Sequence, residues 1–215
     1  QVVDDPQKMP GATWFEGARL NYAENILRYR DNQTAICFKG QHLPSQSLTF
    51  EELYTQVERV AYQLRKKGVK KGDRIAGMVA NMPETIVMML AASSIGAIWS
   101  SCSPDFGIES IVNRFKQIDP VLLVCVDGYY YQDKIIDCNE KINALRAELT
   151  TVESTVMISF TGEGQHSTDV ASMQEWLETP SPEPLVFEPL PFDHTLYILY
   201  SSGTTGNPKC IVHSA

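Results

Sequence analysis

The chain has 215 residues, of which 43% are hydrophobic, so it can bury the core of one domain or of a domain with an extension. Its net charge of −8 argues against a nucleic-acid surface, and no stretch approaches the roughly 18 apolar residues that a bilayer span requires. The five cysteines show neither CxxC nor Cys/His ligand spacing, which predicts free thiols in a reducing compartment.

The first strong element is a helix that we expect to begin after Thr49. Thr49 and Glu52 have the spacing of a capping box, apolar residues follow at helical spacing, and Gly68 is placed to end the helix. Beyond it, strands and helices alternate. We expect strands at residues 74–80, 97–101, 121–126 and 155–159, and helices at residues 83–95, 108–118 and 134–149. Single helices between strands predict a parallel sheet that is covered on both faces.

Five prolines between residues 179 and 191 predict a stiff, extended connector without regular structure. The connector leads to an apolar run at residues 196–200, which predicts a buried strand. Another strand is expected to begin at Cys210. The residues between these two strands therefore form a loop.

This loop, with the sequence YSSGTTGNPK at residues 200–209, has the composition of an anion-binding loop. Its glycines allow successive N–H groups to face one anion, its hydroxyls add donors, and its lysine adds a mobile positive charge. Two residues separate the glycines and the lysine comes three residues later, so the spacing is not that of a Walker loop. A surface turn that binds nothing is the alternative. The candidate phosphate ligands are Ser201, Ser202, Gly203, Thr204, Thr205, Gly206 and Lys209.

The loop resembles the signature loop of the adenylate-forming superfamily, which includes acyl-CoA synthetases, luciferases and the adenylation domains of peptide synthetases. The resemblance continues over residues 48–104, where a helix, a GD-R turn, a strand and an N-x-P-E helix start follow one another. The segment WFEGARLNYAENIL at residues 14–27 resembles the N-terminal extension of the branch that activates acetate and acetoacetate. Residues 95–107 and 208–215 are most similar to the acetoacetate-activating members. The acetate-activating members typically carry a glycine pair where this chain has Pro104 and Asp105.

This resemblance implies an α/β fold that forms part of the large N-terminal domain of an adenylate-forming enzyme, with a parallel-rich sheet and covering helices. It implies an N-terminal extension at residues 1–47 and an incomplete AMP-binding domain at residues 48–215. We interpret the chain as an N-terminal fragment that is truncated just after the phosphate loop.

The implied reaction is the ATP-dependent ligation of acetoacetate to CoA through an acyl-adenylate, which yields AMP and pyrophosphate. The loop residues would hold the β- and γ-phosphates of ATP together with Mg²⁺. In the family, basic residues near the stretch that is YYYQDK here contact CoA, so Lys134 is a candidate CoA contact, although Tyr131 stands where an arginine is expected. No catalytic residue or metal ligand is predicted within the chain, because the acyl pocket, the adenine site, the magnesium carboxylate and the catalytic lysine are expected after Ala215.

Two alternatives stay open at this point. The enzyme would act on acetate or propionate, as another short-chain synthetase, or the chain would be a non-catalytic truncated isoform that works by interaction. In the enzyme interpretation, the partners are the small molecules acetoacetate, ATP and CoA, and the expected location is the cytosol.

Overall fold

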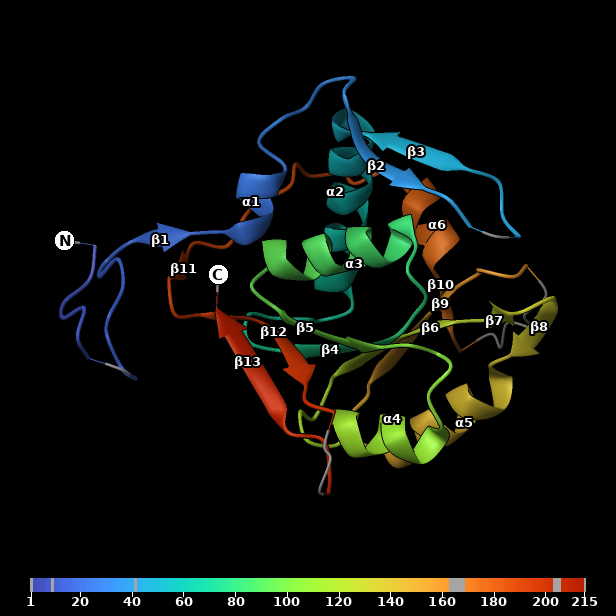
Figure 1. The fold of residues 1–215 in the computed structure, drawn as a ribbon. Helices are drawn as coiled ribbons and strands as arrows, with labels where there is room; N and C mark the ends of the chain where they lie inside the picture. Colours follow the sequence, from blue (N-terminus) through green and yellow to red (C-terminus); the bar gives the residue numbers. More distant parts are fainter. Residues whose placement is uncertain (1, 9, 41, 163–168, 203–205, 215) are drawn as a thin grey trace.

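In the computed structural model, which describes residues 2–8, 10–40, 42–162, 169–202 and 206–214, a seven-stranded sheet runs through the centre of the molecule (Figure 1). Its strand order is β10-β9-β6-β4-β5-β12-β13, and neighbouring strands are parallel except for β12 and β13. The strands are β4 (Arg74–Met78), β5 (Ile98–Cys102), β6 (Leu122–Val126), β9 (Ser154–Ile158), β10 (Ala171–Ser172), β12 (Thr195–Tyr200) and β13 (Cys210–Ser214). The predicted parallel-rich sheet is therefore confirmed.

Helices cover both faces of the sheet, as Figure 1 shows. One face is covered by α1 (Tyr22–Ile26), α2 (Phe50–Lys66), α3 (Pro83–Ser94) and α6 (Met173–Glu178), and the other by α4 (Ile108–Phe115) and α5 (Asn139–Glu148). Alternate residues of one strand enter the two cores: Leu122 and Val124 pack with the first set of helices, and Leu123 packs with the second. All five residues of β6 are buried, as expected of a strand that is covered on both faces.

Helix α2 begins and ends as its sequence predicts. The Thr49 hydroxyl accepts a hydrogen bond from the Glu52 N–H at 3.1 Å, and the Glu52 carboxylate accepts one from the Thr49 N–H at 2.8 Å. Gly68, which follows the C-cap residue Lys67, has a φ of +86°, which side-chain-bearing residues rarely adopt. The capping box is confirmed.

The helix predicted at residues 134–149 is wrong in its first part. Residues 128–137 form an antiparallel hairpin of β7 (Gly128–Tyr131) and β8 (Lys134–Asp137), and α5 begins only at Asn139. Three consecutive tyrosines and two isoleucines favour strands, and Gln132 turns the chain with a φ of +54°. The Asp137 carboxylate then accepts a hydrogen bond from the Asn139 N–H at 2.8 Å, which satisfies one of the free N–H groups at the start of α5.

Besides the β7–β8 hairpin, two further small antiparallel pairs among the described residues lie outside the main sheet. They are β2 (Thr34–Phe38) with β3 (Gln46–Thr49), and β1 (Arg19–Leu20) with β11 (Leu190–Pro191). The second pair corrects the expectation that the proline-rich connector is wholly irregular, because its last two residues pair with the N-terminal segment. The Asn21 side chain reinforces this junction: it caps α1 and donates to the carbonyl oxygens of Ser93 and Glu188, both at 3.0 Å.

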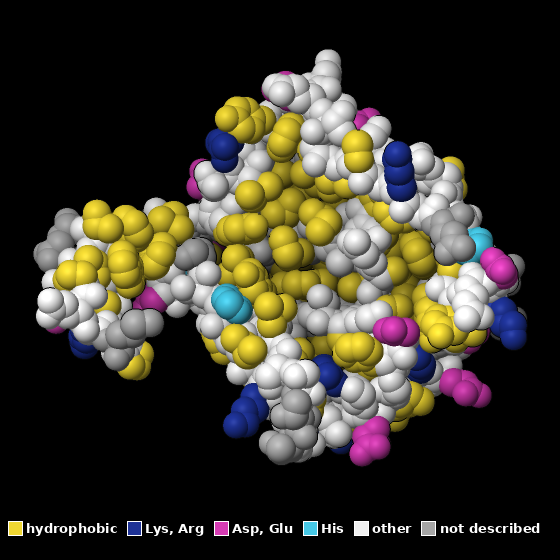
Figure 2. All heavy atoms as spheres, in the orientation of Figure 1, with side chains coloured by type: hydrophobic (Ala, Val, Ile, Leu, Met, Phe, Trp, Pro, Cys, Tyr) yellow, Lys and Arg dark blue, Asp and Glu magenta, His cyan; other side chains and the backbone are white. Residues whose placement is uncertain are grey.

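The last two strands carry exposed apolar side chains. Leu199, Ile211 and Val212 are 45%, 44% and 59% exposed. Figure 2 shows hydrophobic side chains over much of this side of the molecule and over the N-terminal segment that projects from it.

Candidate active site

The candidate site lies where the parallel strands end. Because β4, β5, β6, β9 and β12 run in the same direction, their carboxyl ends meet at one edge of the sheet, which we call the carboxyl edge. Ligands of open α/β sheets bind at this edge. The loop at residues 201–209 leaves it from the end of β12 and returns as β13.

The two ends of this loop are fixed to each other. The Ser201 N–H donates to the Lys209 carbonyl oxygen at 2.9 Å, and the Ser201 hydroxyl accepts a hydrogen bond from the Lys209 N–H at 3.0 Å. Ser202, Gly206 and Lys209 are exposed, and Gly206 has a φ of +126°. The predicted ligands Gly203, Thr204 and Thr205 lie outside the described residues. The Ser201 hydroxyl has a structural partner that the sequence did not indicate.

Residues after helix α4 hold the second half of the loop. The side-chain amide of Gln117 donates to the Pro208 carbonyl oxygen at 2.9 Å, and its oxygen accepts the Cys210 thiol at 3.7 Å. One turn earlier, the Arg114 guanidinium lies over the Tyr200 ring, 5.9 Å from its centroid. The sequence analysis singled out neither side chain, since their partners are about 90 residues away in the chain.

Two side chains at the carboxyl edge, Tyr200 and Cys102, have raised pKa values. Burial raises the pKa of Tyr200 to about 12, partly offset by its hydrogen bond with Ser100 at 3.1 Å. Burial also raises the pKa of the Cys102 thiol to about 12, although the positive charge of Arg114 lowers it. A thiol with so high a pKa is uncharged near pH 7 and is not an activated nucleophile.

The segment at residues 103–107 lies beside the loop strand. Its Phe106 ring lies under the Arg114 guanidinium at 4.8 Å, and the Lys141 ammonium donates to the Pro104 carbonyl oxygen at 2.6 Å. Arg114 therefore contacts both Phe106 and Tyr200, which belong to neighbouring parts of the edge. This segment contains the Pro104 and Asp105 pair that distinguishes the two substrate branches in the sequence analysis.

A pocket of about 350 Å³ opens at the same edge. It lies between the β7–β8 hairpin and the loops that follow strands β2, β4 and β5. Its aromatic side includes Tyr129, Tyr130 and Tyr131, with His42 stacked on Tyr130 at 4.9 Å. The predicted CoA contact Lys134 is exposed on β8, directly opposite Tyr131 in the hairpin register. The structure thus puts Lys134 next to a residue that lines the pocket.

Asp127 organises the far end of the carboxyl edge, and the sequence analysis did not single it out. Its carboxylate accepts hydrogen bonds from the N–H groups of Phe160, Thr161 and Gly162 at 2.8, 2.9 and 3.0 Å, and from the Ser159 hydroxyl at 3.2 Å. Burial by itself raises the pKa of Asp127, but these hydrogen bonds outweigh it and hold the pKa below its ordinary value. Asp127 therefore fixes the loop after β9 as an anion near neutral pH.

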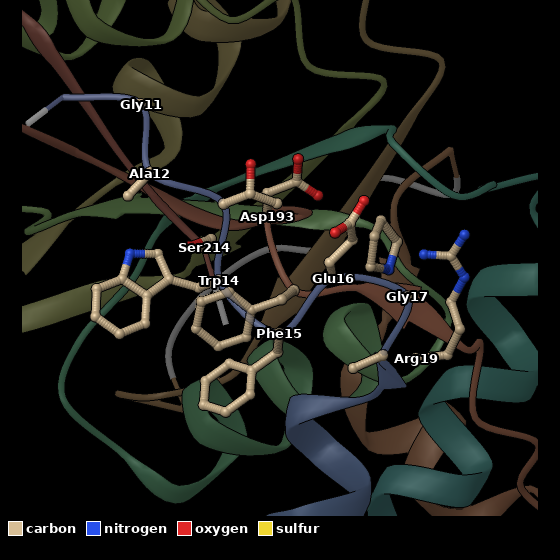
Figure 3. A pocket seen from close by; sticks show the side chains of 13 residues that line it. Gly11, Ala12, Trp14, Phe15, Glu16, Gly17, Arg19, Asp193 and Ser214 are labelled. Atoms are coloured by element: carbon tan, nitrogen blue, oxygen red, sulfur yellow. The ribbon is translucent and has the colours of Figure 1, made fainter. Parts of the chain in front are cut away.

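A larger cavity of about 430 Å³ lies elsewhere, between the N-terminal segment and the chain before β12 (Figure 3). Its wall contains Trp14, Phe15 and Phe192, and the rings of Phe15 and Phe192 pack edge to face at 4.9 Å. Ser214, another wall residue, pairs with Thr195 at the amino end of β12. This cavity is at the opposite edge of the sheet from the loop, so it is not part of the candidate active site.

Within the described residues, no group of three or more His, Cys, Asp or Glu side chains is arranged to hold a metal ion. The same residues include no helix with the length and apolarity needed to cross a membrane. The candidate site consists of the loop after β12 and an aromatic pocket at the same carboxyl edge of the sheet.

Comparison with known proteins places this geometry in context. The model of the AMP-binding enzyme family matches residues 23–215. Over the whole chain, the sequence is 46% identical to the acetoacetyl-coenzyme A synthetase of Rhizobium meliloti, 42% to acetoacetyl-CoA synthetase of Mus musculus and 41% to that of Macaca fascicularis. The chain spans about a third of the length of these relatives, 33% to 34%.

A solved structure of acetoacetyl-CoA synthetase from Streptomyces lividans superposes on the whole chain with a TM-score of 0.93 and 40% sequence identity, and the chain covers 33% of it. The predicted fold, part of the N-terminal domain of an AMP-binding enzyme, is confirmed by this match and by the parallel sheet.

Proposed function

The chain belongs to the family of AMP-binding enzymes, and from this premise we propose that the full-length protein ligates acetoacetate to CoA. In the first step, an acetoacetate oxygen attacks the α-phosphorus of ATP, and the bond to pyrophosphate breaks. In the second step, the CoA sulfur attacks the acyl carbon, AMP leaves, and the thiol proton is released. The observation that carries the choice of acid is the 41–46% identity of the whole chain to acetoacetyl-CoA synthetases.

The loop supplies the electrostatic part of this proposal. Negative charge builds up on the departing pyrophosphate, and preorganised donors at that position stabilise the transition state. We assign this role to the hydroxyls of residues 201–206, to the backbone N–H groups of residues 202–206 and to the charge of Lys209. Support comes from the tied ends of the loop and from the exposed position of Lys209 at the carboxyl edge.

The aromatic pocket is the candidate position for CoA. It lies at the same edge as the loop, and its Tyr131 is paired in register with Lys134. In this proposal, Lys134 contributes one charge to the phosphates of CoA, while the tyrosine rings offer a flat surface for the nucleotide.

Three further parts of the proposal concern the whole protein. Residues 1–47 act as an extension and residues 48–215 as part of the AMP-binding domain. Mg²⁺ accompanies ATP in this proposal, and no step here is derived through it. The protein works in the cytosol.

The test is to measure AMP release by the full-length protein with ATP, CoA and each of acetoacetate, acetate and propionate. We expect kcat/KM for acetoacetate to exceed that for acetate by at least about tenfold, the discrimination that pocket contacts of about 1.4 kcal/mol provide. A preference for acetate or propionate would move the assignment to another short-chain synthetase. No AMP release with any of the three acids would favour a non-catalytic role.

A further inference from the structure

Gln117 lies one residue beyond the C-cap of α4 and holds the phosphate loop on both sides of its lysine. Its Nε2 donates to the carbonyl oxygen of Pro208 at 2.9 Å, and its Oε1 accepts the Cys210 thiol at 3.7 Å. Pro208 and Cys210 are the two neighbours of Lys209 in the chain. A single side chain thus contacts the residues immediately before and after the proposed phosphate-binding lysine.

Lys209 itself is fixed through its backbone, while its side chain is exposed. Its N–H and its carbonyl oxygen both bond to Ser201, at 3.0 and 2.9 Å. With the Gln117 contacts, hydrogen bonds anchor three consecutive residues: Pro208 and Lys209 through the backbone, and Cys210 through its side chain. Across the described residues, no hydrogen bond or ion pair of the Lys209 ammonium is present, so this group is available to a bound anion.

The amide group of Gln117 suits this arrangement because it is both a donor and an acceptor. Its Nε2 also donates to the Asn113 carbonyl oxygen at 2.7 Å, which ties the amide to α4. A carboxylate at this position would keep the acceptor and lose both donors, and an apolar side chain would lose all three contacts. The link therefore runs from α4 through one amide to the loop.

Anchoring matters here because a lysine has a long, flexible side chain. Fixing its Cα reduces the range of positions that the ammonium samples, and so reduces the entropy cost of placing the charge against phosphate in the transition state. We propose that Gln117 is a positioning residue for Lys209, and this inference rests on the proposed phosphate-binding function of the loop.

The test is a double-mutant cycle in the full-length protein, read as acetoacetate-dependent exchange of labelled pyrophosphate into ATP. Gln117→Leu keeps the size of the side chain and removes its hydrogen bonds. We expect it to lower the kcat of exchange by roughly tenfold, the effect of about one to two neutral hydrogen bonds, with KM for ATP changed less than about threefold. In a Lys209→Ala background, Gln117→Leu should change the rate by less than about twofold, because the residue it positions is gone.

Lys116→Ala is the matched control. Lys116 is the adjacent residue, and its partner is the exposed Glu148 at 2.6 Å, away from the loop. The rate of pyrophosphate exchange by Lys116→Ala should equal that of the unmodified protein, because exposed ion pairs contribute little.

Two results would overturn the positioning role: an unchanged rate for Gln117→Leu, or an equal loss in the presence and absence of Lys209. If Lys209→Ala alone exchanged as fast as the unmodified protein, the phosphate role of the loop would fail, and the positioning role with it. These outcomes are distinguishable from one another.

Discussion

Replacing Asp127 by asparagine should loosen the loop after β9 while leaving the sheet intact. The carboxylate accepts four hydrogen bonds from residues 159–162, and Asp127 is 1% exposed. The side-chain oxygen of an asparagine can still accept the hydrogen bonds from the N–H groups of Phe160 and Thr161. Its NH₂ group then faces the Gly162 N–H, so two donors meet where a donor and an acceptor met before.

The magnitude follows from this count. A hydrogen bond to a charged group contributes about 1.5–3 kcal/mol, and the substitution loses this bond to the exposed Gly162 and weakens the others by removing the charge. We therefore expect Asp127→Asn to lower the local opening free energy by about 3 kcal/mol. At about 1.4 kcal/mol for each factor of ten, amide exchange at residues 160–162 should become roughly a hundredfold faster.

The assay is hydrogen–deuterium exchange of peptides that cover residues 159–162. Because the pKa of Asp127 is lowered in the folded state, its contribution is complete above its unfolded value of about 3.9 and is lost as the pH falls through the folded pKa. The difference between the two proteins should thus be large at pH 7 and shrink below about pH 4. The control is Asp133→Asn, in the exposed turn of the β7–β8 hairpin, away from the loop after β9. Equal exchange of Asp127→Asn and unmodified protein at pH 7 would refute the anchoring role.

Two further predictions concern packing and reactivity. Gly77→Ala should destabilise the protein by about 1–3 kcal/mol, because a Cβ there would lie 2.8 Å from the Trp99 ring. The control is Gly107→Ala, whose Cβ meets open space. Equal melting temperatures of the two variants would contradict this reasoning. Near pH 7.5, a thiol reagent should label the exposed Cys37 in the folded protein and spare the buried Cys125, because burial raises the pKa of Cys125 well above its ordinary value. Comparable labelling of both thiols, measured by mass spectrometry, would disprove this prediction.

The sequence predicts best what is decided locally. The Thr49 capping box, the strand before the phosphate loop and the alternation of helices and strands depend on residues that are close in the chain, and the structure contains all of them. The β7–β8 hairpin was missed because a charged and apolar pattern after Lys134 also fits a helix, and the turn at Gln132 has no glycine to mark it.

The contacts that organise the candidate site join residues that are far apart in the chain. Gln117 and Pro208 are 91 positions apart, and Asp127 bonds to residues 32 to 35 positions away. No local pattern reports such pairs, because the parallel sheet brings their segments together only after folding. The loop was therefore predictable from the sequence, and the side chains that hold it were not.

The central claim is that the loop at residues 201–209 binds the phosphates of ATP while a carboxylate is activated. The most direct measurement is acetoacetate-dependent pyrophosphate–ATP exchange by full-length protein and by its Lys209→Ala variant. Loss of a charge-assisted contact of about 1.5–3 kcal/mol predicts exchange that is about ten to 150 times slower in the variant, with an unchanged circular dichroism spectrum. Exchange at the same rate in both proteins would contradict the claim.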